Sequence, residues 1–498
     1  MRLRTKLLSI LLIACAIAGT VYYSSKSEEI LNESQLFKRR KTTVRLWYTD
    51  SALTDYLTAQ AVSYNESNNK VRVEPVLTSG LEYLEAINTA SVNSEEYPDL
   101  YIITNDSLEK AYLSGLATEI DSVEAVNDPE VFSNAAINAV TYEGKIIGYP
   151  YYFETSALLY NKTYLEDKAR ADIEAEIDAS VGEAAQQEID ESEEITDESI
   201  ENSSVEMVEA DISDEEVQKR VQEMIPSTIA QILSFAENYN APEQVEGVFK
   251  WDVTDILYNY CFVGNYLNVG GLAGDDTSQI DIYNADTISC MKMYQELNQF
   301  FAIDSETATY DSIMDEFING KMVFTLATTD SIAKIEQAKE EGTCDFEYGV
   351  SVVPDITDNY KTRTMSVTDC IVVNGYSENQ AAANAFARFL CSDNTEDIYK
   401  LAGKVSAHYG VQYENTALTS FMKVYEQSVP LPKMIETSNF WAFLEIAFTE
   451  IWNGKNVNST LKALNEKVMM QITGQEYVSE EIPDPESGSI TDGINSAE

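Results

Sequence analysis

The segment 42–104 alternates extended apolar runs with stretches of helical periodicity, and this alternation limits the fold more than any other feature. Both "TTVRLWY" (42–48) and "VRVEPVL" (71–77) have the pattern of strands, while 53–66 and 80–92 have helical spacing. "PDLYIIT" (98–104) is almost continuously apolar, as is typical of strands buried in parallel sheets. The order strand, helix, strand, helix, strand predicts an α/β fold with helices packed on a sheet.

The chain is too long for one such unit. It has 498 residues, and roughly 380 remain outside its two ends and one biased insert, which predicts two lobes. We expect one lobe to comprise 42–152 with 352–402, and the other 153–351 with 403–475. Further strands are expected within 315–328, 346–354 and 369–375, and further helices at 286–301, 378–391, 394–403, 416–428, 440–452 and 457–472.

Charge and residue usage exclude several classes of function. The net charge of −51 argues against a nucleic-acid partner, because phosphate contacts need clustered Lys and Arg. His408 is the only histidine, so no His cluster can form and we expect an ordinary surface or packing role. The cysteines form no C-x-x-C pair and five of them are expected to be buried thiols; they are Cys15, Cys261, Cys290, Cys344, Cys370 and Cys391. We therefore expect no metal site and no cofactor.

The N-terminus indicates export and attachment to a membrane. It begins "MRLRTK" and then runs without a charge from Leu7 to Tyr23, a basic start followed by an apolar segment. "LIAC" (12–15) resembles a lipobox, which favours lipidation of Cys15, whereas the apolar residues after Cys15 favour an uncleaved signal-anchor. In both interpretations 1–41 is anchor and linker, and the rest of the chain lies on the extracellular face of the membrane.

Residues 166–223 differ from the rest of the chain. They contain 22 Asp and Glu against 4 Lys and Arg, and no aromatic residue. Such a segment buries too little apolar surface to offset its ordering entropy, so we expect a largely disordered or loosely helical insert. The capping box Ser213 to Glu216 and the helical pattern after Pro226 mark the return of order. The acidic tail 476–498 is also expected to be disordered.

The segment "YEGKIIGYPYYFETSALLYNK" (142–162) concentrates aromatic residues and one carboxylate, Glu154, between two strand-like runs. Tyr149 to Glu154 is too aromatic for an ordinary solvent-exposed turn. We expect the chain to cross between the two lobes here, with aromatic faces and a carboxylate at the crossing.

Four stretches in a fixed order resemble the extracellular solute-binding proteins of ABC importers, of the maltose- and carbohydrate-binding type. They are 97–121, 142–162, "FINGKMVFTLATTDSI" (317–332) and the C-terminal pair of helices at 431–468. The resemblance implies a two-lobed periplasmic-binding-protein-like fold of type II, in which the lobes close over a solute. It also implies that the acidic insert is an added loop on the second lobe, because the family joins its "Tyr-Asn-Lys" strand directly to the following helix.

The resemblance implies a sugar as the solute and delivery to ABC permease subunits as the function. Aromatic walls suit the apolar faces of sugar rings, and carboxylates accept strong hydrogen bonds from their hydroxyls. The residues expected to face the solute are Asp50, Ser51, Asn105, Asp106, Tyr151, Tyr152, Glu154, Tyr260, Thr329, Asp330 and Trp441. Thr104 and Thr329 stand near positions where the maltose-binding type has tryptophans, which weakens maltose specifically but not carbohydrate in general.

Three alternatives remain open from the sequence. A receptor of the same fold can present its ligand to a membrane sensor kinase instead of a permease. A binder of another solute, such as a polyamine, a peptide or a metal chelate, also fits the carboxylates. A glycosidase needs a pair of catalytic carboxylates, and the sequence offers no convincing pair, so we expect no enzyme activity.

Overall fold

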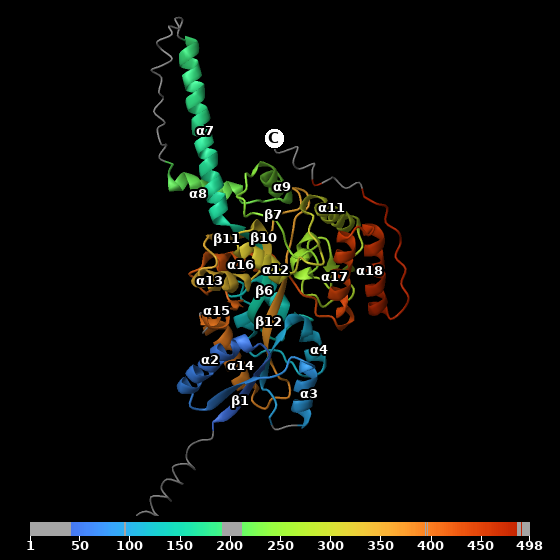
Figure 1. The fold of residues 1–498 in the computed structure, drawn as a ribbon. Helices are drawn as coiled ribbons and strands as arrows, with labels where there is room; N and C mark the ends of the chain where they lie inside the picture. The colour runs from blue at the N-terminus through green and yellow to red at the C-terminus, as the bar shows by residue number, and fades with distance from the viewer. Residues whose placement is uncertain are drawn as a thin grey trace, which may run out of the picture.

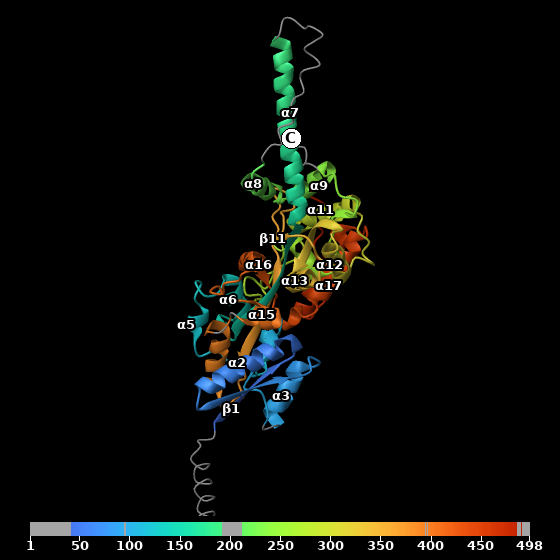
Figure 2. The ribbon, with the colours of Figure 1, turned by 60° about the vertical axis from the view of Figure 1, so that its left-hand side comes forward.

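The computed structural model describes residues 41–93, 96–191, 212–393, 395, 397–485 and 490. The expected anchor, which includes Cys15, lies outside these residues, and so do 486–489 and 491–498 of the acidic tail. Two lobes follow one another along the long axis of the molecule, and strands join them at a waist (Figures 1 and 2). We call the lobe that contains β1 lobe 1 and the lobe that contains β10 lobe 2.

Lobe 1 has the predicted alternation of strands and helices. Its strands lie in the order β2-β1-β3-β12-β6. They are β1 (Thr42–Tyr48), β2 (Val71–Leu77), β3 (Leu100–Thr104), β12 (Met365–Val373) and β6 (Tyr149–Asn161). The helices of this lobe are α2 (Thr54–Ser67), α3 (Tyr83–Asn93), α4 (Leu108–Leu113), α5 (Val123–Val126), α6 (Asn134–Val140), α14 (Gln380–Arg388) and α15 (Asp397–Ala402). The first three strands are parallel, so their carboxyl ends meet at one edge of the sheet.

Strand β6 is the predicted crossing between the lobes. Its first half, up to Thr155, pairs with β12, and its second half, from Ser156, pairs with β10. One continuous strand therefore passes through the waist, and both lobes share one ten-stranded sheet. The expected lobe boundary at 152/153 falls inside this strand, so the domain division given above stays a prediction.

Lobe 2 packs helices around a smaller group of strands. The strands that continue from β6 are β10 (Met322–Thr328), β7 (Gly247–Phe249) and β11 (Tyr348–Ser351). The helices are α9 (Ile229–Asn238), α10 (Ile256–Asn259), α11 (Ala285–Phe301), α12 (Tyr310–Ile318), α13 (Ser331–Glu341), α16 (Thr416–Gln427), α17 (Phe440–Trp452) and α18 (Val457–Thr473). Trp251 and Trp452 pack edge-to-face, with ring centroids 5.6 Å apart, and are almost fully buried in its core.

Short elements complete the chain. The short strands are β4 (Thr141–Tyr142), β5 (Lys145–Ile146), β8 (Asn268–Val269), β9 (Ile280–Asp281), β13 (Val405–Ser406) and β14 (Val429–Pro430). The short helical turns are η1 (Ser51–Leu53), η2 (Asn105–Ser107), η3 (Tyr260–Phe262), η4 (Phe389–Asp393) and η5 (Ile435–Thr437). Strand β13 pairs with β6 and β14 pairs with β12, so two later segments of the chain also reach the waist.

Of the two states expected for 166–223, disordered or loosely helical, the described part is helical. Helix α7 (Lys162–Glu191) has 30 residues, about 45 Å of helix, and projects from lobe 2 away from lobe 1 (Figures 1 and 2). Helix α8 (Asp214–Met224) packs against its base through two ion pairs, Arg170–Asp214 and Arg220–Glu176, each 2.8 Å long. We had expected this segment to bury too little apolar surface to become ordered, but Ala169 and Ile173 of α7 and Val217 and Val221 of α8 are buried. The helix propensity of its Ala and Glu residues also favours the helical state.

Three further expectations are tested by the described residues. The prediction of disorder is wrong for 476–485, where Ile482 accepts a hydrogen bond from Asn458 and donates one to Tyr283. Five cysteines are buried free thiols, as predicted. His408 packs edge-to-face on Phe132, which confirms a packing role. Among the described helices, none is both long and apolar enough to cross a membrane.

Candidate functional site

Five side chains converge at the waist from four separate segments of the chain. We call Asp50, Tyr152, Glu154, Asp369 and Lys404 the waist cluster. Asp50 follows β1, where its Oδ1 accepts a hydrogen bond of 2.9 Å from the Ala52 N–H and so begins η1. Tyr152 and Glu154 are two residues apart on β6, so both point to the same face of the sheet. Asp369 lies opposite Tyr152 in the β12–β6 register, and Lys404 lies between α15 and β13.

Lys404 holds the cluster together. Its Nζ lies 2.8 Å from a carboxylate oxygen of Asp50 and 3.7 Å from one of Glu154. The same Nζ lies 5.3 Å from the centroid of the Tyr152 ring. One ammonium group therefore joins the end of a lobe 1 strand to the crossing strand β6.

The carboxyl groups of the cluster differ in their affinity for protons. Burial alone would raise the pKa of Asp50, but its hydrogen bonds from Lys404 and Ala52 lower that pKa overall. Burial raises the pKa of Glu154, and the nearby Lys404 offsets this only in part. Burial, together with the charge of Glu154, raises the pKa of Asp369 to about 7. The cluster thus contains more carboxyl groups than its single ammonium can neutralise.

A pocket on the lobe 1 side opens next to the cluster. Its volume is about 330 Å³, and Asp369 contributes to its wall. The other lining residues come from the carboxyl ends of β1 and β3 and from the helices α3, η2 and α4; they include Thr49, Tyr83, Thr104, Ser107 and Lys110. This is the edge of the sheet at which an open α/β fold places its binding residues.

Lobe 2 contributes Asp330 close to the cluster. Asp330 precedes α13, accepts a hydrogen bond of 2.9 Å from the Tyr310 hydroxyl, and lies 3.5 Å from Lys334. Its charge acts on Glu154 and helps to raise the pKa of that residue. Tyr310 stacks on Tyr258 with ring centroids 5.4 Å apart. An aromatic pair therefore stands behind Asp330, at a position that we had not predicted.

Several residues expected to face the solute are buried instead. Asn105 is fully buried, where its amide donates to the Leu431 carbonyl at 2.8 Å and accepts from the Thr368 N–H at 3.0 Å. Tyr151 is 1% exposed and packs between Tyr56 and Tyr152. Thr329 is 3% exposed, at the end of the buried strand β10. Each of these three side chains serves the packing of the lobes, so a direct contact with a solute is not supported for them. Tyr152 is also buried, with 3% of its surface exposed, and its contact with a solute stays a prediction.

Three other predicted residues remain accessible. Ser51 and Asp106 are exposed, and the Thr104 hydroxyl donates a hydrogen bond of 2.5 Å to Asp106. Trp441, at the start of α17, is half-buried. Its ring packs edge-to-face on Tyr260 at a centroid distance of 5.7 Å.

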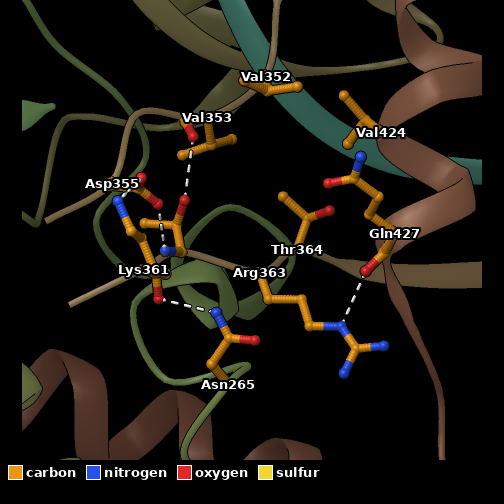
Figure 3. Close-up of a pocket in the computed structure, with 10 residues that line it drawn as sticks. Asn265, Val352, Val353, Asp355, Lys361, Arg363, Thr364, Val424 and Gln427 are labelled. Atoms are coloured by element: carbon orange, nitrogen blue, oxygen red, sulfur yellow. Dashed lines mark hydrogen bonds and ion pairs between the residues drawn. The ribbon is translucent and has the colours of Figure 1, made fainter. Parts of the chain in front are cut away.

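Tyr260 is 2% exposed and lines a different hollow. That groove, of about 720 Å³, adjoins a second pocket of about 450 Å³ through the shared residues Asn265 and Arg363. Figure 3 shows the second pocket, where the Arg363 Nε donates a hydrogen bond of 2.8 Å to the Gln427 carbonyl. Helix α16 lines both hollows and stacks Tyr425 on Phe153, which points to the face of β6 opposite Glu154. Tyr260 therefore lines this groove and not the lobe 1 pocket. Its predicted contact with a solute stays a prediction.

Sequence reasoning missed Asp369 and Lys404. Asp369 interrupts the apolar strand "VTDCIVV", and a charge at such a position was a signal that could have identified it. Lys404 lies in a short segment without any pattern, so only the fold brings it to Asp50.

Comparison with known proteins identifies a family and a fold. The family model described as "Bacterial extracellular solute-binding protein" matches residues 59–417. The maltodextrin-binding protein MdxE of Bacillus subtilis (strain 168) is 21% identical over 221 residues, which are 42% of this chain and 51% of that relative. The aligned part thus spans about half the length of this relative.

Solved structures resemble the whole two-lobed body. An extracellular solute-binding protein from Staphylococcus aureus in complex with maltose superposes with a TM-score of 0.65 at 18% identity, covering 87% of this chain and 98% of that one. A cyclo/maltodextrin-binding protein complexed with maltotetraose gives a TM-score of 0.66 at 18% identity and covers 88% and 99%. The maltose-binding periplasmic protein MalE from Listeria monocytogenes gives 0.64 at 18% identity and covers 88% and 100%. These similarities confirm the predicted two-lobed fold.

Proposed function

The chain belongs to the bacterial extracellular solute-binding protein family, and from this premise we propose that it binds an oligosaccharide of the maltodextrin class between its lobes and delivers it to ABC permease subunits. Members of this family bind and hand over a solute and are not enzymes. The waist cluster carries the proposal, because it gathers hydrogen-bonding groups of lobe 1 and of the crossing strand beside an open pocket.

The chemistry of the cluster suits a neutral, hydroxyl-rich solute. Asp50 and Glu154 are acceptors for hydroxyl groups, and charge-assisted hydrogen bonds of this kind are stronger than neutral ones. The ammonium of Lys404 is a donor for ring or hydroxyl oxygens. Trp441 is half-buried and offers part of its ring as a flat apolar surface for a sugar face. Two of the similar structures were solved in complex with maltose and with maltotetraose, which supports the same class of solute here.

The revised set of solute-binding residues has six members. From the predicted set we retain Asp50, Tyr152, Glu154, Asp330 and Trp441, and we add Asp369. Lys404 positions Asp50 and Glu154. Ser51 and Asp106 stay as predicted contacts at the exposed rim of lobe 1.

Capture is proposed to proceed by closure of the two lobes. The lobes meet through the strands β6, β12 and β13, and a solute that touches Asp50 on one side and Asp330 on the other stabilises the closed arrangement. The N-terminal segment is proposed to tether the protein to the outer face of the membrane, either through lipid on Cys15 or as an uncleaved anchor.

Titration with maltose, maltotriose and maltotetraose tests the proposal. Isothermal titration calorimetry and tryptophan fluorescence are expected to give one saturable site, and small-angle X-ray scattering is expected to give a smaller radius of gyration with sugar. Absence of saturable binding to all three sugars, for protein that melts cooperatively, would contradict the proposal.

A further inference from the structure

The waist cluster contains the chemistry of an ammonium-binding site, and a residue of the protein already occupies that site. Carboxylates that surround a cation and an aromatic face beside it are the groups that recognise amines. Here the amine is the side chain of Lys404, which lies 2.8 Å from Asp50, 3.7 Å from Glu154 and 5.3 Å from the centre of the Tyr152 ring. Only 20% of the Lys404 side chain is exposed.

The backbone around Lys404 holds this ammonium in place. Gly403 ends α15 with a φ of 66°, in the left-handed region that glycine tolerates best. Directly after Lys404, β13 pairs Val405 with Phe153 and Ser406 with Tyr152 on the crossing strand. The Ser406 N–H also donates a hydrogen bond of 2.9 Å to the Tyr413 hydroxyl. The ammonium is therefore delivered by a segment that is itself part of the sheet at the waist.

Other cations near the cleft are paired with carboxylates outside the waist cluster. Lys110 lines the lobe 1 pocket but lies 2.7 Å from Glu85. Lys334 lies 3.1 Å from Asp311 and 3.5 Å from Asp330. Among the described residues, Lys404 is the cation that forms ion pairs with Asp50 and Glu154.

We propose that Lys404 sets the charge specificity of the cleft: it occupies the place that the ammonium of a polyamine would take, and so reserves Asp50 and Glu154 for the hydroxyls of a neutral solute. This inference rests on the proposed cleft but not on the identity of the sugar. A bound amine near Lys404 would be repelled at short range, in a partly buried site where repulsion is strong. Without Lys404, three carboxyl groups and the Tyr152 ring face the same space with no cation among them.

Calorimetry with spermidine at low ionic strength tests this inference. The variants are Lys404→Met, which removes the charge at nearly constant length, and Lys404→Arg, which keeps it. Lys455→Met is the matched control, because Lys455 is an exposed lysine paired at 2.7 Å with Glu450. We expect the wild type, Lys404→Arg and Lys455→Met to bind spermidine equally weakly. Lys404→Met is expected to bind spermidine at least about tenfold more tightly than the wild type, and added salt should weaken that binding.

The outcomes separate this inference from the proposed function. Saturable spermidine binding to the wild type, as tight as to Lys404→Met, overturns the inference, and this measurement needs no variant to fold. Failure of Lys404→Met to gain spermidine binding, when its melting is cooperative, also overturns it; Lys404→Gln provides the same test if Lys404→Met does not fold. If the wild type binds no maltodextrin but Lys404→Met gains spermidine binding, the assigned sugar is wrong and the role of Lys404 stands.

Discussion

The molecule has two acidic regions, the helices α7 and α8 and the waist cluster, which differ in the number, exposure and arrangement of their charges. The helices α7 and α8 carry many carboxylates on exposed faces, and their ion pairs are open to solvent, as in Arg170–Asp214 with side chains 45% and 89% exposed. The waist cluster has three carboxyl groups and one lysine, brought together from distant segments and partly withdrawn from water: the side chains of Asp50, Glu154 and Lys404 are 34%, 35% and 20% exposed. Water screens the charges in the first region, whereas in the second region each charge shifts the pKa of its neighbours. A functional site in this chain is therefore marked by convergence and burial of a few charges, and not by their number.

The largest effect on sugar affinity is expected when one carboxylate of the waist cluster is neutralised. Glu154→Gln replaces a charged acceptor at the waist and also removes a partner of Lys404. Loss of such a hydrogen bond costs about 1.5–3 kcal/mol, so we expect maltodextrin affinity to fall by roughly 10–100-fold in calorimetry.

The matched control for that change is Glu176→Gln on α7, where the carboxylate is 2.8 Å from Arg220. This variant makes the same chemical change, a carboxylate to an amide. Its affinity for sugar should stay within about twofold of the wild type. Equal losses in both variants would show that the two regions do not differ as described.

The next effect concerns the dependence of stability on pH. Asp369 has a pKa of about 7 in the folded protein, above its ordinary value of 3.8. Between these values the folded state holds a proton that the unfolded state has lost. This contribution to stability is therefore fully present below pH 3.8 and is lost as the pH rises through 7.

Denaturant unfolding of the wild type and of Asp369→Asn, compared between pH 5 and pH 8, measures this contribution. The free energy of unfolding of the wild type should decline relative to the variant by up to about 1.4 kcal/mol per pH unit. Parallel curves for the two proteins would contradict the buried, carboxylate-facing environment of Asp369.

The smallest effect is expected at the base of α7. Arg220→Ala removes an ion pair whose side chains are 33% and 61% exposed. Exposed pairs contribute less than about 1 kcal/mol, so the unfolding free energy should change by less than that. A loss of unfolding free energy above about 2 kcal/mol would mean that ion pairs dominate the contact between α7 and α8. This would contradict the screening of these pairs by water.

Local patterns predicted the elements well and the assembled site only in part. The alternation in 42–104 and the aromatic crossing at 149–154 are signals within one segment, and the structure confirms both. The position of Glu154 followed from the resemblance to the family. Lys404 could not be predicted, because its role depends on a contact with Asp50, far away in the sequence.

Tyr151 and Tyr152 show why the sequence could not predict the orientation of individual side chains at the site. The register between β12 and β6 shifts after Asp369, so that Asp369 faces Tyr152 while Cys370 faces Pro150. Tyr151 is the extra residue of this bulge and turns into the core, and Tyr152 joins the cluster. Alternation along a strand cannot reveal such a shift. The insert shows the opposite error: its apolar residues were judged too few to order it, but Ile173, Val217 and Val221 are buried.

A crystal structure of the protein grown with maltotetraose tests the central claim most directly. The account predicts one sugar chain between the lobes, with hydroxyl oxygens within hydrogen-bond distance of Asp50 and Glu154 and a sugar ring against Trp441. A sugar bound elsewhere, for example in the groove beside Tyr260 and Arg363, with the waist cluster in contact with water alone, would contradict it.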